Sequence, residues 1–323
     1  MSFRLGHSAT RPEGASVSSG PSQSGGLPSK RAVVFAVLLA FAGIAAILYP
    51  YVSDYLARRQ QAEVGQQQEQ VVAQAPKQDL SAEWGAAREF NRRQLQGRVV
   101  VSDPFDPSNA TPSDEEYAKV LNLAGDGVMG QLVIPSIGVN LPIYHSVSDD
   151  QLLRGVGHLP TTSLPIGGPS THSVLAGHTG LPSAKILGDI DQLKEGDWFI
   201  IRVLGEDHAY RVTSTEVVLP TETQSLVTQD GKDLVTLVTC TPYGVNTHRL
   251  LVHAERCDVP QEWLDMQDKV DDVPLLSPAD QSAPLIVFSL IGLGVGIGLL
   301  VLRWAVVRKR ERDSSYVPRH ERK

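Results

Sequence analysis

The sequence predicts a mainly β protein, a β-barrel with short helices flanked by two transmembrane helices. Eight short apolar and β-branched runs, separated by turns that contain Gly and Pro, occupy the middle of the chain. Runs of this length and spacing are typical of a barrel. Two segments, 32–53 and 281–302, contain no charged residue and are each long enough to cross a bilayer as a helix.

The expected strands share apolar or β-branched character and short length. They are 130–134, 141–144, 173–176, 198–203, 208–212, 215–218, 234–239 and 250–254. An amphipathic helix is predicted over 80–96 from the spacing of Trp84, Ala87, Phe90 and Leu95. Further helices are expected at 117–123, 187–193 and 260–270, whereas 60–78 reads as a polar, Gln-rich stalk without a clear apolar face.

The charges around the two spans predict the membrane topology. Lys30 and Arg31 precede the first span, and a dense basic cluster follows the second at 303–312. By the positive-inside rule both termini are cytoplasmic and the region between the spans is extracytoplasmic, in the cell membrane. The first span could instead be a cleaved signal peptide. The long preceding tail and the lack of a small-x-small cleavage site favour an uncleaved signal anchor.

The formal net charge is −7, although both tails are basic, so the segment between them is strongly acidic. An acidic exterior argues against nucleic acid as a partner. The predicted organisation is a disordered cytoplasmic tail (1–31), a signal anchor (32–53), a stalk with helices (54–100), a loop (101–116), the barrel (117–258), a helix and linker (259–280), a second span (281–302) and a basic cytoplasmic tail (303–323).

Cys240 and Arg249 flank a short turn that carries Pro242, Gly244 and Asn246. Because strand-like runs lie on both sides, we expect a hairpin in which Cys240 ends one strand and Arg249 begins the next. A cation beside a thiol favours the thiolate, which is the nucleophilic form. The alternative is that Cys240 packs as a small buried hydrophobe.

His178 is the candidate acid and base. It follows the run 173–176 and lies between Gly177 and Gly180, which mark an exit from a strand into a loop. Arg249 cannot be the base because its guanidinium stays protonated. Six other histidines are interpreted as structural: His145, His158, His172, His208, His248 and His253.

The two cysteines, Cys240 and Cys257, could in principle form an extracellular disulfide. Cys257 is expected past the last strand, without an activating partner, and is interpreted as a bystander. No Cys/His cluster has the spacing of metal ligands, so neither a metal site nor a cofactor is predicted.

The segments 236–249 (TLVTCTPYGVNTHR) and 176–182 (AGHTGLP) resemble the sortases, the cysteine transpeptidases of Gram-positive cell surfaces. TLVTC matches the TLxTC signature of the family, and Arg249 follows at the family's distance. The resemblance is greatest to the pilus-assembling class C branch. That branch shares 157–168 (GHLPTTSLPIGG), 182–185 (PSAK), a C-terminal membrane helix and an Asp-Pro-aromatic motif, which is 103–105 here.

This resemblance implies an eight-stranded sortase-type barrel that cleaves an LPxTG-like sorting signal between Thr and Gly. Cys240 would form the thioester, His178 would protonate the departing amine and deprotonate the incoming one, and Arg249 would hold the substrate and stabilise the oxyanion. In the pilus branch the acceptor is a lysine amine of another pilin subunit. The implied partners are therefore pilin subunits.

The same resemblance implies that Asp103, Pro104 and Phe105 form a lid over the active site. An aspartate can pair with Arg249, and an aromatic ring can cover Cys240. The alternative is an ordinary loop, since a second Asp-Pro pair follows directly.

Two alternative functions remain. One is a cell-wall-anchoring sortase that uses a peptidoglycan amine as the acceptor. The other is a non-enzymatic, membrane-tethered surface scaffold in which Cys240 and His178 only pack.

Overall fold

The computed structural model describes residues 30–96, 101–109, 115–179 and 184–270, together with helical residues 292, 294, 296, 298, 303 and 306–308. The chain divides into two compact units, Met1–Gly43 and Ile44–Lys323. In the first unit the described residues, 30–43, are helical. The second unit contains the barrel.

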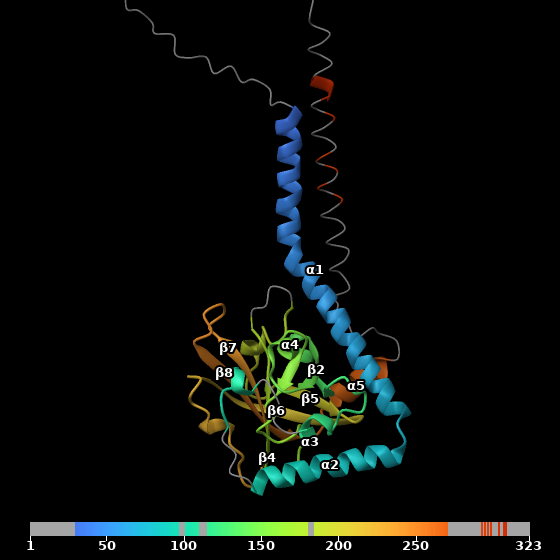
Figure 1. Ribbon diagram of the computed structural model, residues 1–323, viewed down its shortest axis with the longest axis vertical. Coiled ribbons are helices and arrows are strands. Elements are labelled where there is room, and N and C mark those ends of the chain that lie inside the picture. Colours follow the sequence, from blue (N-terminus) through green and yellow to red (C-terminus); the bar gives the residue numbers. More distant parts are fainter. Residues whose placement is uncertain are drawn as a thin grey trace, which may run out of the picture. The chain divides into compact units, whose positions relative to one another are not determined.

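Eight strands close into a barrel in the order β1-β2-β3-β4-β7-β8-β6-β5. Most of these strands are labelled in Figure 1. Two pairs are parallel, β2 with β3 and β4 with β7, and the other pairs are antiparallel. The strands are β1 (Val128–Ile134), β2 (Val139–His145), β3 (Val156–His158), β4 (Thr171–Ala176), β5 (Trp198–Val203), β6 (Glu206–Val218), β7 (Asp233–Thr241) and β8 (His248–Cys257). The prediction of a mainly β barrel is confirmed.

The barrel interior is filled by large apolar side chains from several strands. Leu132, Ile143, Phe199, Tyr210 and Leu237 are all fully buried in one cluster. Full burial of a Leu, Ile or Phe side chain contributes roughly 1.5–3 kcal/mol. The closed barrel is therefore a rigid support for residues that lie at the strand ends.

Two features of the sheet differ from the prediction. The expected strands 208–212 and 215–218 are one strand, β6, because a register shift between Val212 and Ser214 breaks the alternation without ending the pairing with β8. Strand β3 was not predicted. It has only three residues, and its extended conformation depends on pairing with β2 and β4 on either side.

The helices also differ in part from the prediction. The stalk 60–78 is helical over most of its length, in α1 (Lys30–Gln74) and the start of α2 (Lys77–Gln96). Gln61 and Gln68 are buried, so this polar stretch does have a packed face. In α2, Ala87 and Phe90 are buried as expected, whereas Leu95 is 44% exposed.

The prediction of a helix at 187–193 was wrong. Only Ile190–Gln192 is helical there, as a short 3₁₀ turn. The neighbouring Gly188 disfavours a longer helix. The helix predicted at 260–270 is present as α5 (Gln261–Val270). The helix predicted at 117–123 is helical only as far as Lys119, in α3 (Glu115–Lys119), and α4 (Asp149–Leu152) is an additional short helix.

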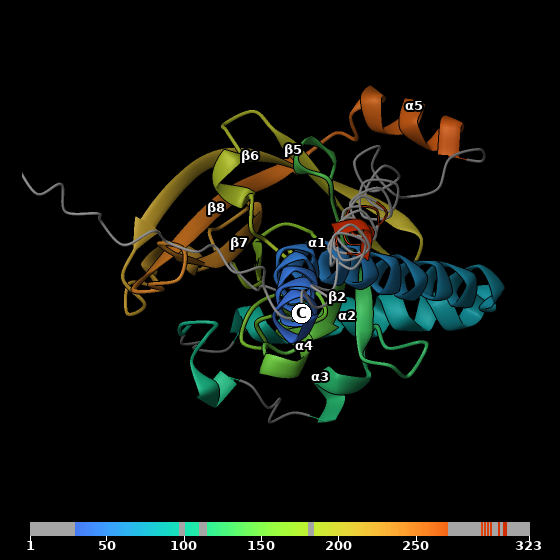
Figure 2. The ribbon, with the colours of Figure 1, turned by 90° about the horizontal axis from the view of Figure 1, so that it is seen from above.

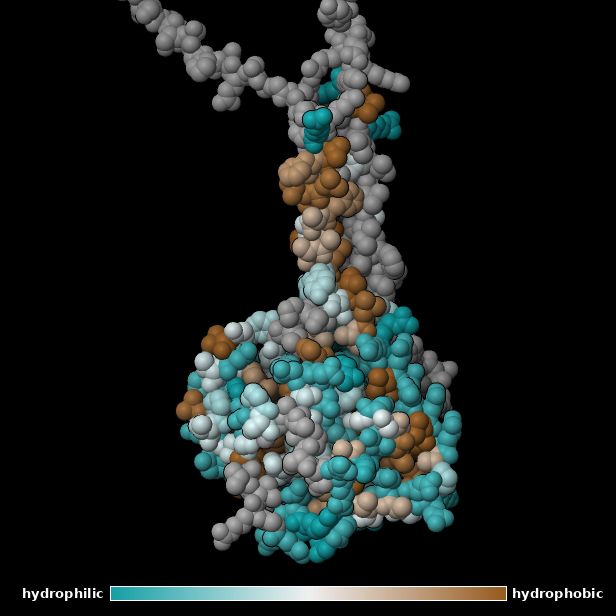
Figure 3. Space-filling view, in the orientation of Figure 1, coloured by the Kyte–Doolittle hydropathy of each residue, from teal (hydrophilic) through white to brown (hydrophobic). Residues whose placement is uncertain are grey.

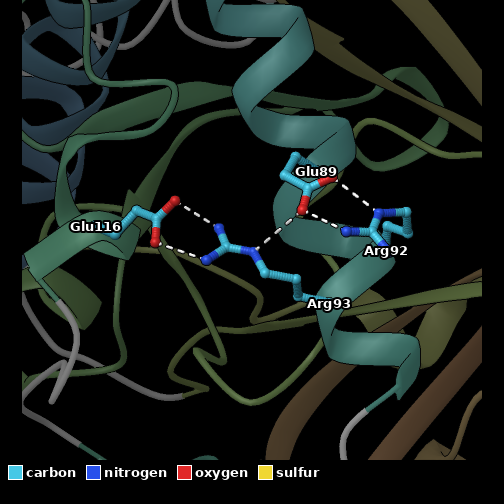
Figure 4. Close-up of polar contacts among 4 residues, drawn as sticks. All are labelled: Glu89, Arg92, Arg93 and Glu116. Atoms are coloured by element: carbon cyan, nitrogen blue, oxygen red, sulfur yellow. Dashed lines mark hydrogen bonds and ion pairs between the residues drawn. The ribbon is translucent and has the colours of Figure 1, made fainter.

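A chain of surface ion pairs links α2 to α3 (Figure 4). Arg93 donates to both carboxylate oxygens of Glu116 at 2.8 and 2.5 Å. Glu89 accepts two hydrogen bonds from Arg92 at 2.8 and 2.6 Å and lies 3.7 Å from Arg93. Exposed pairs contribute little stability individually. This network nevertheless ties together the two helices on either side of the segment that carries Asp103.

Helix α5 packs against β5 and β6 through Trp263, which is buried with Ile200 and Ala209. Figure 2 shows this helix at the periphery of the barrel. Trp263 Nε1 and Gln267 Nε2 both donate to Asp207 of β6 at 2.7 Å. Asp207 also accepts two hydrogen bonds from Arg202 of β5. Trp198 of β5 also donates to Glu262 at 3.1 Å, so polar contacts with both strands hold helix α5 on the barrel.

Among the described residues, one helical stretch, Leu38–Gln74 in α1, is long and apolar enough to cross a membrane. It overlaps the predicted first span. Figure 3 shows hydrophobic side chains along α1, whereas the visible face of the barrel is mostly hydrophilic. The second predicted span, 281–302, and the N-terminal tail 1–29 lie largely or wholly outside the described residues.

Candidate active site

Cys240 and Arg249 lie directly opposite each other near the end of the β7–β8 pair. The turn between them is closed by the carbonyl of Pro242, which accepts hydrogen bonds from the backbone of Val245 and Asn246, both at 3.0 Å. Asn246 has a φ of 60°, a left-handed conformation that asparagine tolerates better than most residues. The local sequence thus forms the hairpin that brings the thiol and the guanidinium to one rim of the barrel.

His178 reaches the same rim from β4. This strand runs parallel to β7 with Ala176 opposite Val238, and Gly177 N donates to the Val238 carbonyl at 3.0 Å. Extending this register by two residues brings His178 level with Cys240. Gly177 has no room for a side chain, because a Cβ there would lie 2.8 Å from Leu187.

Thr239 connects the segment around His178 to the strand that carries Cys240. Its hydroxyl donates to the Gly177 carbonyl at 2.7 Å and is also hydrogen-bonded to the hydroxyl of Thr179. Since Thr239 has a single proton to donate, Thr179 is the donor in the second bond. Sequence reasoning missed this role, although Thr239 belongs to the TLxTC signature.

Thr236, the first residue of the same signature, is fully buried and joins three strands. Its hydroxyl lies 2.7 Å from His172 Nε2 on β4 and 2.8 Å from His253 Nδ1 on β8. His253 in turn contacts Glu216 of β6 at 3.0 Å. These contacts fit the structural interpretation of both histidines.

Asp103 and Arg249 form a bidentate ion pair, with Nε–Oδ1 and Nη2–Oδ2 distances of 2.8 and 2.7 Å. Both side chains are largely buried. The Phe105 ring lies 5.0 Å from the Arg249 guanidinium carbon and 5.7 Å from the His178 ring, centroid to centroid. Pro104, between them, is buried. The segment 103–105 therefore contacts two of the three predicted catalytic residues.

Burial is the largest influence on the pKa values of Cys240 and His178. It raises the pKa of the Cys240 thiol; the positive charge of Arg249 opposes this and the negative charge of Asp103 reinforces it. Burial also lowers the pKa of His178, and Asp149 acts in the opposite direction. Both pKa shifts favour the neutral form, a thiol at Cys240 and an uncharged imidazole at His178.

Four other features considered from the sequence are a disulfide, the position of Cys257, a metal site and the segment 182–185. Both cysteines are free, so the disulfide does not form. Cys257 is the last residue of β8 and not past the strand, because its pairing with Ala209 extends the ladder beyond the apolar run. Within the described ranges no group of three or more His, Cys, Asp or Glu residues could hold a metal ion. The segment 182–185 lies partly outside these ranges.

The closed barrel carries a thiol, an imidazole and a guanidinium toward one rim, and these are the groups that cysteine-dependent acyl transfer requires. A family model described as the Sortase domain matches residues 132–257. The solved structure of sortase C-1 from Actinomyces oris is 45% identical, with a TM-score of 0.53, and the match covers 56% of this chain and 99% of that one. The chain belongs to the sortase family of cysteine transpeptidases.

Other relatives agree with this membership. A structure described as the pilus-related sortase C of Group B Streptococcus is 34% identical, with a TM-score of 0.53, over 59% of this chain and 95% of that one. Sortase A of Bacillus anthracis is 30% identical over 139 residues, which is 42% of this chain. This chain spans 64% of the length of that protein. Family membership favours an enzyme over a non-enzymatic scaffold.

Proposed function

We propose that this protein is a membrane-anchored transpeptidase that cleaves an LPxTG-like sorting signal between Thr and Gly and joins the acyl group to a lysine amine of another pilin. The observation that carries the proposal is the pairing of Cys240 with Arg249 across β7 and β8, with His178 two residues beyond the end of β4, the strand that pairs in parallel with β7. The lid contacts of Asp103 and Phe105 at the same rim support it.

In the proposed mechanism His178 takes the proton of the Cys240 thiol, and the sulfur attacks the Thr carbonyl to form a thioester. His178 gives this proton to the departing glycine amine as the peptide bond breaks. It then takes a proton from the incoming lysine amine, which attacks the thioester, and returns it to the sulfur as the carbon–sulfur bond breaks. Arg249 donates hydrogen bonds to the substrate carbonyl as negative charge develops on its oxygen. Opening of the lid must come first, because Asp103 occupies the Nε and Nη2 groups of Arg249.

The proposal that pilin is the substrate rests on similarity to class C enzymes and on one structural detail. The segment 157–168, which resembles the pilus branch, supports α2: Asn91 accepts from the Leu164 N–H at 2.7 Å and donates to the Leu164 carbonyl at 3.2 Å. This segment therefore holds in place the helix from which the lid segment departs. We infer that the shared motif serves the lid architecture of that branch.

The proposed topology has two spans, cytoplasmic termini and an extracytoplasmic barrel. The apolar stretch in α1 supports the first span, and the sequence 281–302 supports the second. Anchoring both enzyme and membrane-held pilin in one membrane would raise their effective concentration.

The deciding experiment is mass spectrometry of the full-length protein in detergent after incubation with a peptide that carries an LPxTG signal. We expect a thioester adduct on Cys240 and loss of the adduct on addition of an amine. Offering a pilin lysine and a peptidoglycan amine together decides between pilus assembly and cell-wall anchoring. If no adduct forms on Cys240 even in a lid variant, the proposed function is wrong.

A further inference from the structure

The guanidinium of Arg249 is held on two sides by different parts of the chain. Nη1 donates to the backbone carbonyls of Asn246 and His248, both at 3.1 Å. Nε and Nη2 donate to the carboxylate of Asp103, which lies 146 residues away in sequence. The carbonyls that hold Nη1 belong to residues close to Arg249 in sequence. These hydrogen bonds can therefore persist when Asp103 leaves Nε and Nη2.

The side held by the loop is organised before any ligand arrives. The turn is closed by two hydrogen bonds to the Pro242 carbonyl, and the left-handed conformation of Asn246 is part of that turn. The guanidinium is therefore fixed with its Nε and Nη2 groups directed at the Asp103 carboxylate. A planar fork of this kind matches a carboxylate better than any neutral acceptor.

We propose that the Nε/Nη2 side of Arg249 is a carboxylate-binding subsite that accepts the C-terminal carboxylate of the peptide acid formed when water, in place of an amine, resolves the thioester. Asp103 occupies this subsite in the closed state as an internal carboxylate. The identity of the peptide rests on the proposed function. The carboxylate subsite itself rests on the observed ion pair.

The chemistry places the product carboxylate close to this subsite. Water adds to the thioester carbonyl, the carbon–sulfur bond breaks, and the electron pair leaves with sulfur as the Cys240 thiolate. His178 takes one proton from the water and returns it to the thiolate. The new acid ionises in solution at neutral pH, and its carboxylate forms beside the residue that pairs with Arg249.

It follows that the hydrolysis product and the lid compete for one cation. A peptide acid retained on Arg249 would block the next substrate, and return of Asp103 would expel it. The intact signal has only neutral carbonyls there and binds less tightly than its own acid product.

The first test uses acetate as the carboxylate probe on full-length protein in detergent. Alkylation by neutral iodoacetamide is followed at Cys240 by peptide mass spectrometry, with Cys257 as the internal reference thiol. Asp103→Ala should accelerate alkylation of Cys240 by about threefold or more, because an anion that raises the thiol pKa is removed. In this variant acetate, compared with chloride at equal ionic strength, should slow the alkylation of Cys240 toward the wild-type rate.

The matched control is Asp103→Ala combined with Arg249→Lys, which retains a positive charge and lacks the planar fork. It should not respond to acetate, and neither should the wild type, whose subsite is filled. If Asp103→Ala is insensitive to acetate, or if the double variant responds equally, no carboxylate subsite exists on Arg249.

The second test addresses the product itself. Cys240→Ala prevents turnover, and combining it with Asp103→Ala empties the subsite. Calorimetry compares the peptide Leu-Pro-Ala-Thr as a free acid and as an amide. We expect the acid to bind about tenfold tighter, and the preference to disappear with Arg249→Lys. An acid that binds no tighter than the amide overturns the product assignment. Failure of the proposed function is distinct, because it appears as the absence of a thioester on Cys240.

Discussion

Asp103 pairs with Arg249, the cation opposite Cys240. The aspartate forms a bidentate ion pair with Arg249, and Arg249 is the residue opposite Cys240 in the β7–β8 ladder. With this pair formed, the negative charge of Asp103 adds to burial in raising the pKa of the thiol. One contact thus occupies two donor groups of Arg249 and favours the neutral form of the Cys240 thiol.

Replacement of Cys240 by alanine is expected to lower transpeptidation by at least about 10³-fold, because the nucleophile is removed. The thermal unfolding midpoint should change little, since a thiol is replaced by a methyl-sized group at a strand end. Activity is measured by mass spectrometry of ligated pilin peptides. Substantial ligation by the variant would remove Cys240 from the mechanism.

His178→Ala is expected to lower the ligation rate by about 10²- to 10⁴-fold, the usual range for loss of a general acid and base.

Arg249→Lys is expected to lower the ligation rate by about 10²-fold, because lysine cannot present two parallel donors to the substrate. Steady-state kinetics of both variants provide the measurement. A wild-type rate for Arg249→Lys would place Arg249 outside the site.

Thr239→Val is expected to reduce kcat by about tenfold with a smaller change in KM, because two hydrogen bonds that position the His178 segment are lost. Thr239→Ser keeps the hydroxyl and should retain most of the activity. Circular dichroism of both variants checks the fold. If valine and serine have the same kinetic effect, the hydroxyl does not position His178.

Asp103→Ala with Phe105→Ala is expected to accelerate alkylation of Cys240 and to shift its pH dependence to lower pH. In the wild type the raised pKa of Cys240 means that alkylation keeps increasing above about pH 8.5, the ordinary range of a cysteine. Removing the anion and part of the burial lowers that pKa. Rate–pH profiles indistinguishable from the wild type would show that the segment does not cover the nucleophile.

Added protease is expected to release a fragment containing Cys240 from intact protoplasts, whereas an epitope tag after Lys323 should be protected. The expectation follows from the apolar stretch in α1 and the basic cluster after the second predicted span. Immunoblotting of both fragments provides the measurement. Digestion of the tag would contradict two spans with cytoplasmic termini.

Much of the barrel could be predicted because strand character is local. The run that became β5 was predicted with its observed ends, Trp198 and Val203, since apolar and β-branched residues fill it and turn residues end it. Strand β3 could not be predicted, because three residues have too little pattern and depend on partners distant in sequence. The prediction of a helix at 187–193 was wrong because helix-like spacing of apolar residues does not require a helix. These residues are buried by the barrel while the chain there is mostly a loop.

The sequence by itself determined the hairpin that pairs Cys240 with Arg249, because the turn lies within ten residues and its Gly and Asn permit left-handed backbone. The tertiary structure alone decided that Thr239 is bonded to both neighbours of His178 and that Phe105 lies against Arg249 and His178. The physical reason is that these contacts join residues about 60 to 144 positions apart in the sequence. Such segments meet only when β4 pairs with β7 and the barrel closes.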